Sequence, residues 1–470
     1  MPKIKPISLR RFNAYCYVRI PYLLISFHEI AWYEAFNAKL LGTIVEDTDG
    51  EYNYMILARD TRKIFRAWDF GDIYESKDEA ELAMVVAFER YENDGQMIYE
   101  QGDEKKIPQE FLIPQVSEDK LHPYYKILNT PGHEGAKNLI NEIIYSFVDV
   151  DGNYLKDFQT TGFDGRLWEL YLYIYFHSSG FDLNNEYKAP DFLVSYWGQK
   201  FAVEAVTVNK SEQFDVKNPT NLKESFLLSL DYMPIKYGSS LVGKLRKKYW
   251  EMDHVKDKPL IIAVHDFHQS STMEHLGSMT WSRSALVYYL YGIRPVYRTN
   301  EDETIRLGVV ETKDGISQEF EKIEWHEWNG KKIEAGFFDL PDADNISAVL
   351  FSNNGTLTTF NRMGQLAGLG SPDVKMLRVM DVFNHDPNSI TPHRVAKYID
   401  QEDYEEAWGD GLVMYHNLNA KHPVDIECFK GVSHMFFDKE RLIVYGYPEP
   451  NNILNSMTVV FIPDQSVEQQ

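Results

Sequence analysis

The sequence predicts an α/β core, in which helices flank a mixed central sheet, between an N-terminal α+β module and a β-rich C-terminal region. Three patterns support this prediction. Residues 26–95 have the pattern of several strands followed by one helix. Residues 160–300 have the order helix, strand, strand, helix, strand, and hairpin patterns dominate after residue 300. At 470 residues, the chain is expected to contain more than one core.

A polar stretch marks the first domain boundary. Charged residues are frequent between residues 94 and 120, and two prolines interrupt any regular element there. We therefore expect an N-terminal α+β module over residues 1–115, a central core over residues 116–300 and a β-rich region over residues 301–470.

Local patterns define the elements of the N-terminal module. Ser76, followed three residues later by Glu79, forms a capping box at the start of a helix over residues 77–91. Apolar runs separated by turn residues predict strands before that helix. These strands are expected over residues 40–45, 52–58 and 64–68.

Composition limits the functional classes. The net charge of −23 disfavours non-specific binding to nucleic acid, although the run from Lys244 to Lys248 is locally strongly basic. Only Cys16 and Cys428 are present, which excludes a disulfide framework and fits a reducing cytoplasm. No signal-peptide pattern and no apolar run of about 18 residues occurs, so we expect a cytoplasmic protein without a membrane-spanning helix.

The central region begins with an unusually apolar helix. Residues 166–176 are apolar nearly all round, as in a buried helix, and Asp164 is the expected N-cap. Glu169 is the only acid within this run, which makes it a candidate functional residue. The alternative is a buried salt bridge between Glu169 and Arg166 or Lys188.

Two neighbouring predicted strands follow, and each carries an acid. Asp191 begins the strand over residues 191–196, and Glu204 lies between apolar residues inside the strand over residues 201–208. A carboxylate among apolar neighbours is costly to bury unless it is paired or bound to a metal. The alternative is structural: Asp191 belongs to a turn, and Glu204 occupies an exposed strand position.

The ordered set Glu169, Asp191 and Glu204 resembles the acidic site of the PD-(D/E)XK, or restriction-endonuclease-like, nuclease superfamily. The element order over residues 160–300 is similar to the common core of that superfamily, so the resemblance covers about 140 residues. It implies that Asp191 and Glu204 hold Mg²⁺ or Mn²⁺ and that Glu169 supports the ion or a bound water. Such a metal can activate water and neutralise charge on a scissile phosphate.

One position departs from the superfamily pattern. Where the superfamily has a lysine two residues after the strand acid, this chain has Val206. That lysine orients the attacking water and offsets negative charge, so an active site here needs another cation. A predicted helix over residues 240–252 offers Lys244 as the preferred substitute and Lys248 as the second. Lys210 is nearer in sequence but lies beyond the strand end.

Other polar motifs are weaker. Arg246 and Lys247 are expected to contact a phosphate backbone, and the alternative for the whole basic run is a solvated helix face. His265 and His268 could ligate a transition metal, but a polar turn at a strand end is the preferred interpretation. The glycine-rich segment 364–370 matches neither a phosphate loop nor a dinucleotide fingerprint and is expected to be a loop.

Hairpin patterns follow residue 300. Asn329-Gly330 lies between the predicted strands 323–328 and 331–337, and this dipeptide is a strong hairpin indicator. A second hairpin is expected from residues 347–351 and 356–360, around an Asn-Asn-Gly turn.

The resemblance implies a Mg²⁺-dependent endonuclease, with DNA preferred to RNA as the expected substrate, of the kind that many superfamily members provide in restriction, repair or anti-phage defence. The alternative is an inactive nuclease-like fold that binds nucleic acid or assembles with a protein partner. Val206 and the net charge favour that alternative. A third hypothesis is a metal-dependent hydrolase of another substrate class that uses His265 and His268. A homo-oligomer is left open, and no membrane partner is expected.

Overall fold

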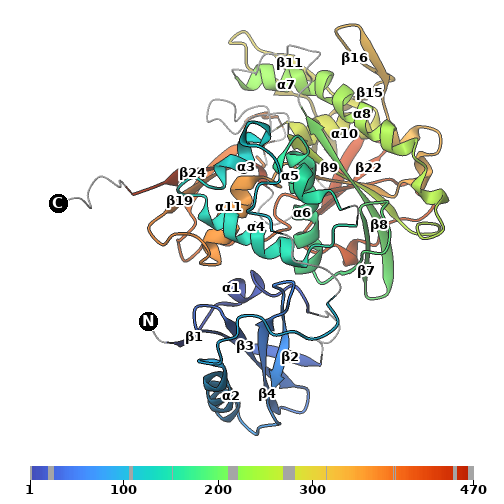
Figure 1. Cartoon of the computed structure of the whole chain (residues 1–470). Coiled ribbons are helices and arrows are strands. Elements are labelled where there is room, and N and C mark those ends of the chain that lie inside the picture. Colours follow the sequence, from blue (N-terminus) through green and yellow to red (C-terminus); the bar gives the residue numbers. More distant parts are fainter. Residues whose placement is uncertain are drawn as a thin grey trace.

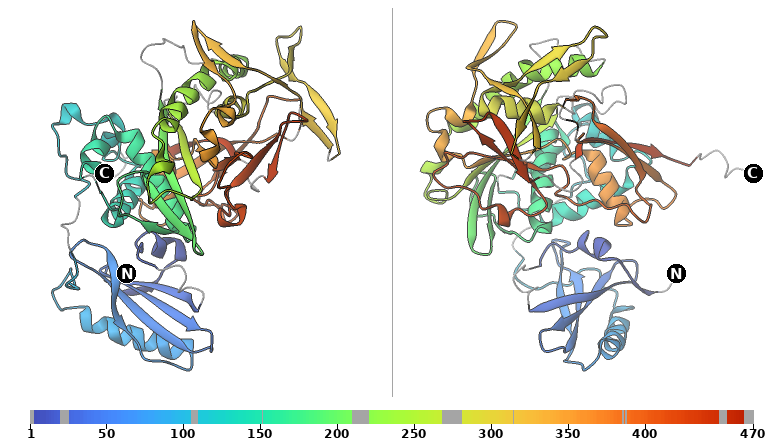
Figure 2. Two further views of the ribbon diagram at one scale, coloured as in Figure 1. Left: turned by 90° about the vertical axis from the view of Figure 1, so that its right-hand side faces the viewer. Right: turned by 180° about the vertical axis from the view of Figure 1, so that it is seen from behind.

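The computed structural model describes most of the chain as an N-terminal module and a larger body built on one eight-stranded sheet (Figure 1). Both rotated views show the N-terminal module below the body (Figure 2). The described residues are 3–19, 26–104, 110–150, 152–209, 221–267, 281–313, 315–384, 386, 388–447 and 453–463.

The N-terminal module is a five-stranded antiparallel sheet covered on one face by helix α2 (Lys77–Tyr91). The strands pair in chain order, and a Cβ at Gly42 would lie 2.7 Å from the Met84 sulfur, so only glycine permits this close packing. The Ser76 side chain accepts a hydrogen bond from the Glu79 amide, which confirms the predicted cap. The strands are β1 (Ile4–Pro6), β2 (Phe27–Ala35), β3 (Leu40–Asp47), β4 (Tyr52–Arg59) and β5 (Phe65–Phe70).

The large sheet is mixed, with the order β23-β22-β21-β18-β9-β8-β7-β6. Its three central strands, β8, β9 and β18, run parallel, and β6 and β7 join β8 as an antiparallel meander. The strands are β6 (Asp182–Asn184), β7 (Phe192–Tyr196), β8 (Gln199–Asn209), β9 (Leu260–Phe267), β18 (Ala348–Ser352), β21 (Val413–His416), β22 (Ser433–Asp438) and β23 (Ile443–Tyr447).

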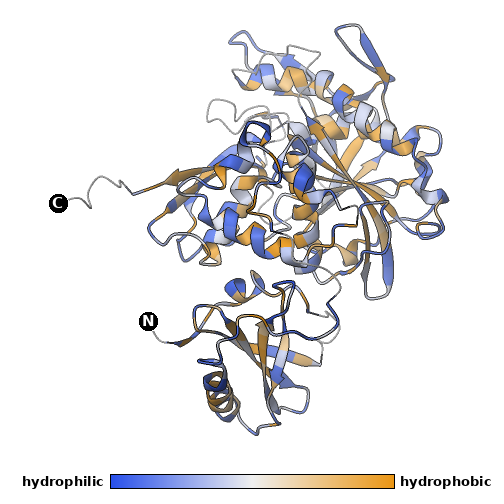
Figure 3. Cartoon of the chain, in the orientation of Figure 1, coloured by the Kyte–Doolittle hydropathy of each residue, from blue (hydrophilic) through white to orange (hydrophobic). Residues whose placement is uncertain are grey.

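Helices cover both faces of this sheet, and the central strands are the most hydrophobic part of the ribbon (Figure 3). Side chains of β8 alternate between the two cores: Phe201 and Val203 pack with α6, whereas Ala202 and Val206 pack with α8. One face carries α4 (Glu134–Ser146), α5 (Tyr154–Gln159), α6 (Phe163–Ser178) and α11 (Leu357–Leu366). The other carries α7 (Leu222–Leu230), α8 (Tyr232–Leu245) and α10 (Ser282–Tyr291).

Smaller elements surround this core. The hairpin predicted around Asn329-Gly330 is confirmed by the antiparallel pairing of β16 (Trp325–Trp328) with β17 (Lys331–Glu334). A separate three-stranded sheet combines β19 (Lys375–Val382), β20 (His393–Tyr398) and β24 (Ile453–Phe461). The other short α-helices and strands among the described residues are α1 (Leu9–Asn13), α3 (Pro123–Ile127), β10 (Ile293–Pro295), β11 (Tyr297–Thr299), β12 (Ile305–Leu307), β13 (Val309–Thr312), β14 (Gly315–Gln318) and β15 (Phe320–Lys322).

The domain boundary predicted at residue 300 does not separate two structural units. Strand β18 pairs in parallel with β9, and β21 to β23 extend the same sheet, so these four strands complete the central core. Burial explains this arrangement, because a parallel central strand such as β9 needs a strand partner on each edge and packing on both faces.

Three local predictions are also wrong. The second predicted hairpin is instead β18 followed by helix α11, and that helix includes the first residues of the glycine-rich segment 364–370. Helix α6 begins at Phe163 with Gly162 at the N-cap position, so Asp164 lies inside the helix rather than at its N-cap. Phe163 is buried and stacks on His122 at 4.8 Å. Helix α8 ends at Leu245, seven residues before the predicted position.

Within the described ranges, none of the helices combines the length and apolar character needed to cross a lipid bilayer. Cys16 and Cys428 are both buried free thiols.

A fragment of residues 116–300 should not fold into a stable unit. It leaves one edge of β9 without β18 and exposes Ile261 and Ala263, which are fully buried in the intact sheet. Circular dichroism melts should show no cooperative transition for this fragment and a single cooperative one for residues 116–463. A cooperative melt of the short fragment would contradict the shared core.

Candidate active site

The candidate site lies at one end of the β7–β8 pairing, where β7 begins at Phe192 and its partner β8 continues past Val203. The pairing of the two strands ends at Phe192 and Val203, and β8 runs on to Asn209. Asp191, which immediately precedes β7, accepts a hydrogen bond from the Ala205 amide through Oδ2 at 2.7 Å. The carboxylate therefore satisfies a backbone donor that a longer β7 would have bonded, and it lies beside an open stretch of the β8 edge.

Glu204 is the buried acid of the site. Alternation along β8 turns its side chain toward α8, and only 4 % of the residue is exposed. Its Oε1 atom accepts hydrogen bonds from the Lys244 ammonium and, at 2.5 Å, from the Tyr249 hydroxyl. A carboxylate buried to this extent requires such partners, and the ammonium also compensates its charge.

Of the two lysines predicted as substitute cations, Lys244 pairs with Glu204, whereas Lys248 does not. The catalytic role of Lys244 stays a prediction. Because α8 ends at Leu245, Lys248 lies beyond the helix, in the left-handed region at φ 49°. Its ammonium is 3.7 Å from Glu251 and 3.4 Å from Asp342, both exposed acids. The prediction of Lys248 as a site residue is therefore wrong, because the i, i+4 spacing requires a helix that has already ended.

Arg246 and Lys247 are exposed next to the site. The Lys247 ammonium lies 5.7 Å from the centre of the Tyr249 ring, and Tyr249 is the residue that holds Glu204. Phosphate contact by Arg246 and Lys247 stays a prediction.

Glu169 lies on α6 and is paired with Arg166, one of its two alternative partners. Arg166 Nη1 donates to both carboxylate oxygens of Glu169, at 2.8 and 3.1 Å. Arg166 Nη2 donates to the Asp157 carboxylate at 2.9 Å. Glu169 also lines a cavity of about 340 Å³ between α6, β8 and α8. The other lining residues include Trp168, Val206, Thr207, Ser240 and Lys244.

Neighbouring acids contribute to raised pKa values at Asp191 and Glu169. Loss of hydration, followed by the charges of Glu204 and Glu169, raises the pKa of Asp191 to about 7, although the residue as a whole reaches solvent. The Ala205 amide and Lys244 act in the opposite direction on this pKa. Burial is also the main cause of a raised pKa at Glu169, where Arg166 opposes it and Glu204 adds to it. This excess of negative charge would favour a bound cation.

The predicted set of three metal ligands does not form. Among the described residues, no group of three or more histidine, cysteine, aspartate or glutamate side chains is arranged to hold a metal ion. Both carboxylate oxygens of Glu169 accept hydrogen bonds from Arg166, whereas Glu204 accepts through Oε1, so Asp191 and Glu204 are the two acids left as candidate ligands.

His265 is not part of a polar turn, because β9 extends through Phe267 and His265 is fully buried inside it. Its ring packs 4.0 Å from Phe267 and 5.0 Å from Trp168, and burial lowers its pKa to about 3. Asp266 accepts hydrogen bonds from the Tyr237 and Ser282 hydroxyls. His268 and Lys210 lie outside the described residues.

Tyr249 is the functional candidate that sequence reasoning missed. It lies in a short 3₁₀ helix (Tyr249–Glu251) directly after the basic run, 45 positions from Glu204. No periodicity connects the two residues, because the fold after α8 brings them together. An aromatic residue next to a lysine run was the only available indication.

Comparisons of the chain with protein-family models, with curated proteins and with solved structures find no match. The site must therefore be interpreted from its own chemistry.

Replacing Lys244 with Met should destabilise the protein by about 1–3 kcal/mol, because Glu204 loses a charged hydrogen-bond donor while staying buried. Adding Glu204→Gln should recover part of that loss in a double-mutant cycle measured by urea denaturation. Arg246→Met, which removes an exposed neighbouring cation, serves as the control. An equal loss for Lys244→Met and the control would contradict the pairing.

Proposed function

We propose that this protein is a metal-dependent nuclease of the restriction-endonuclease-like type, acting on DNA. The observation that carries the proposal is the ion pair between Lys244 and Glu204, next to Asp191 at the open edge of β8. Two acids and a lysine are the chemistry that the resemblance requires, and here the lysine comes from α8 rather than from position 206. The order of helices and strands, α6, β6, β7, β8, α7, α8, β9, supports the same proposal, with β6 and α7 as additions to the predicted order.

The donor set fits a hard divalent cation such as Mg²⁺ or Mn²⁺. Asp191 and Glu204 supply carboxylate oxygens, and such ions keep several water ligands, so two protein ligands are enough. Oε2 of Glu204 has no hydrogen-bond partner in the described part of the chain, which leaves it available as a ligand. A bound ion would activate a water molecule and shield the scissile phosphate.

The remaining residues have distinct roles in this proposal. Lys244 lies in the wall of the cavity and provides the positive charge that orients the attacking water. Tyr249 holds Glu204 in place through its hydroxyl group. Glu169 and Arg166 form an ion pair at the opposite wall.

Buried free cysteines fit a cytoplasmic protein.

Metal affinity should decrease as the pH falls through about 7. The pKa of Asp191 is raised to about 7 in the metal-free site, and a protonated carboxyl group cannot bind a cation. Each unit below that value should weaken Mn²⁺ binding by about tenfold, measured by electron paramagnetic resonance of free Mn²⁺. Asp191→Asn should bind weakly at every pH. Constant affinity of the wild type between pH 8 and 5.5 would contradict the role of Asp191.

Cleavage should depend on both the acids and Lys244. Purified protein is incubated with linear, circular and single-stranded DNA in the presence of Mg²⁺, Mn²⁺ or EDTA. Asp191→Ala and Lys244→Met should each lower the rate by about a hundredfold or more, because each removes charge stabilisation at the reacting phosphate. Lys248→Met should cleave at the wild-type rate, since Lys248 pairs with Glu251 and Asp342 outside the site. Cleavage that resists EDTA or survives Asp191→Ala would refute the proposal.

A second candidate function is binding of DNA without cleavage. It is favoured by the two hydrogen bonds that already hold Oε1 of Glu204 and by the missing third ligand among the described residues. DNA binding in a gel-shift assay, with no cleavage under any metal condition, would support this candidate over the nuclease.

A further inference from the structure

A stacked pair of rings lies beside the candidate active site. The rings of Tyr187 and His254 are almost parallel, at 8°, and their centres are 3.9 Å apart. Tyr187 is the outer ring of the pair, because it is 42 % exposed whereas His254 is half-buried. Since His254 covers one face of the Tyr187 ring, a flat ring from a ligand would stack on the other face.

The pair is connected to the first acid of the site. Nε2 of His254 donates a hydrogen bond to the Ala189 carbonyl oxygen at 2.7 Å, and Asp191 follows two residues later. Ala189 packs against the core on the α8 face of the sheet, toward which Glu204 also points. Tyr187 and Asp191 are four residues apart, so their Cα atoms are at most about 14 Å from each other. At a rise of roughly 3.4 Å per nucleotide, this is the length of about four nucleotides.

The pair is also connected to the second acid. The segment that carries His254 begins with Tyr249, whose hydroxyl donates to Glu204 at 2.5 Å. Backbone hydrogen bonds from Met252 to Tyr249, at 3.0 Å, and from Val255 to Met252, at 2.9 Å, form two consecutive turns in this segment. Hydrogen-bonded turns therefore fix the stacked rings relative to Glu204, and a DNA strand held at the two acids can reach Tyr187.

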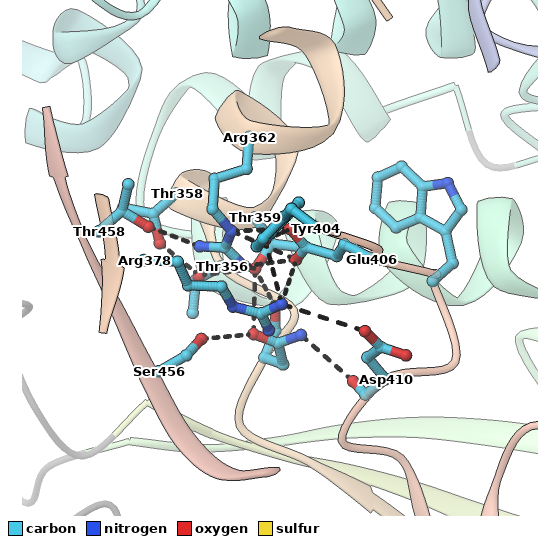
Figure 4. Close-up of polar contacts among 12 residues, drawn as sticks. Thr356, Thr358, Thr359, Arg362, Arg378, Tyr404, Glu406, Asp410, Ser456 and Thr458 are labelled. Carbon is cyan, nitrogen blue, oxygen red and sulfur yellow. Dashed lines mark hydrogen bonds and ion pairs between the residues drawn. The ribbon is translucent and has the colours of Figure 1, made fainter. Parts of the chain in front are cut away.

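A second cavity, of about 1020 Å³, lies between the N-terminal module and the body, and its walls are mainly apolar. The polar network beside it makes its own contacts, because Glu406 accepts hydrogen bonds from Arg362 at 2.6 Å and from Tyr404 at 2.5 Å (Figure 4). Arg362 and Glu406 are buried, so this network holds α11 to the segment that carries Glu406. The Tyr187 ring, in contrast, is open to solvent and next to the candidate metal ligands.

We propose that Tyr187 is a stacking platform for an unpaired base, and that single-stranded DNA is the substrate of the acidic site. A base inside a duplex is covered on both faces by its neighbours, so only an unpaired or terminal base can lie flat on the ring. Aromatic rings stack with every base, so little sequence preference is expected at this position. Because His254 already orders the Tyr187 ring, binding costs less conformational freedom. This inference rests on the proposed nuclease function for the place where the strand is cut.

Binding is measured without cleavage. A single-stranded DNA oligonucleotide that contains 2-aminopurine, whose fluorescence falls when the base stacks, is titrated with the full chain in EDTA. The wild type should quench the fluorescence saturably, and a blunt duplex of the same sequence should bind about tenfold more weakly. Tyr187→Ala should weaken single-strand binding by about tenfold and remove most of the quenching, because the base loses its stacking surface.

Two matched variants serve as controls. Tyr187→Phe keeps the ring and should bind like the wild type. Trp197→Ala removes a side chain that is 71 % exposed, in the turn between β7 and β8 at the other end of this strand pair, and should also bind like the wild type. Thermal melts verify that each variant is folded, and quenching by the wild type keeps the test valid if Tyr187→Ala unfolds. The absence of quenching, equal affinity for single strand and duplex, or unchanged binding by folded Tyr187→Ala would overturn the proposal.

Failure of the platform and failure of the nuclease give different results. Cleavage of single-stranded DNA that requires Asp191 but proceeds at the wild-type rate in Tyr187→Ala, with unchanged binding, would overturn the platform and leave the nuclease in place. Quenching that depends on Tyr187, with no cleavage under any metal condition, would overturn the nuclease and support the platform as a binding site.

Discussion

The burial of one carboxylate, Glu204, is the constraint on which the candidate site depends. A glutamate in the middle of a central strand loses most of its hydration, and the fold compensates with an ammonium from α8 and a phenol from the segment after it. Either partner alone would leave the acid poorly compensated. The position of α8 over the sheet is therefore linked to the chemistry of the site, and not only to the packing of Leu241 and Leu245.

The start of β7 at Phe192, opposite Val203, also shapes the candidate site. It leaves the β8 edge open beyond Val203, and Asp191 satisfies part of that edge with a side-chain oxygen. The short β7 strand thus places Asp191 near Glu204 and leaves Asp191 accessible to solvent. Helix α6 lines both cavities of the molecule, with Glu169 at the smaller one and His177 at the larger. One helix thus borders both cavities.

Sequence patterns predicted the elements whose causes are local. The capped helix α2 and the hairpin at Asn329-Gly330 depend on neighbouring residues, and both are confirmed. Lys244 rather than Lys248 pairs with Glu204 because α8 ends at Leu245, and that helix end was not predicted. The predicted hairpin around the Asn-Asn-Gly turn was wrong because such a turn suits a hairpin and a strand-to-helix connection equally well. In the structure β18 pairs with β9, and helix α11 follows the turn.

Within the candidate site, the sequence allowed Asp191 and Glu204 to be selected, because acids at predicted strand positions are conspicuous. Tyr249 could not be selected, since its contact with Glu204 depends on how the chain turns after α8. The salt bridge of Glu169 with Arg166 was one of two alternatives, and only the helix geometry at i, i+3 decides between them.

The most direct test of the account is anomalous diffraction from crystals of the protein grown or soaked with Mn²⁺. An anomalous peak is expected in contact with the carboxylates of Asp191 and Glu204, with Lys244 beside it, and no such peak is expected in crystals of Asp191→Asn. A wild-type crystal with no manganese at these two acids, or with manganese bound only elsewhere, would contradict the claim that they form a metal-dependent catalytic centre.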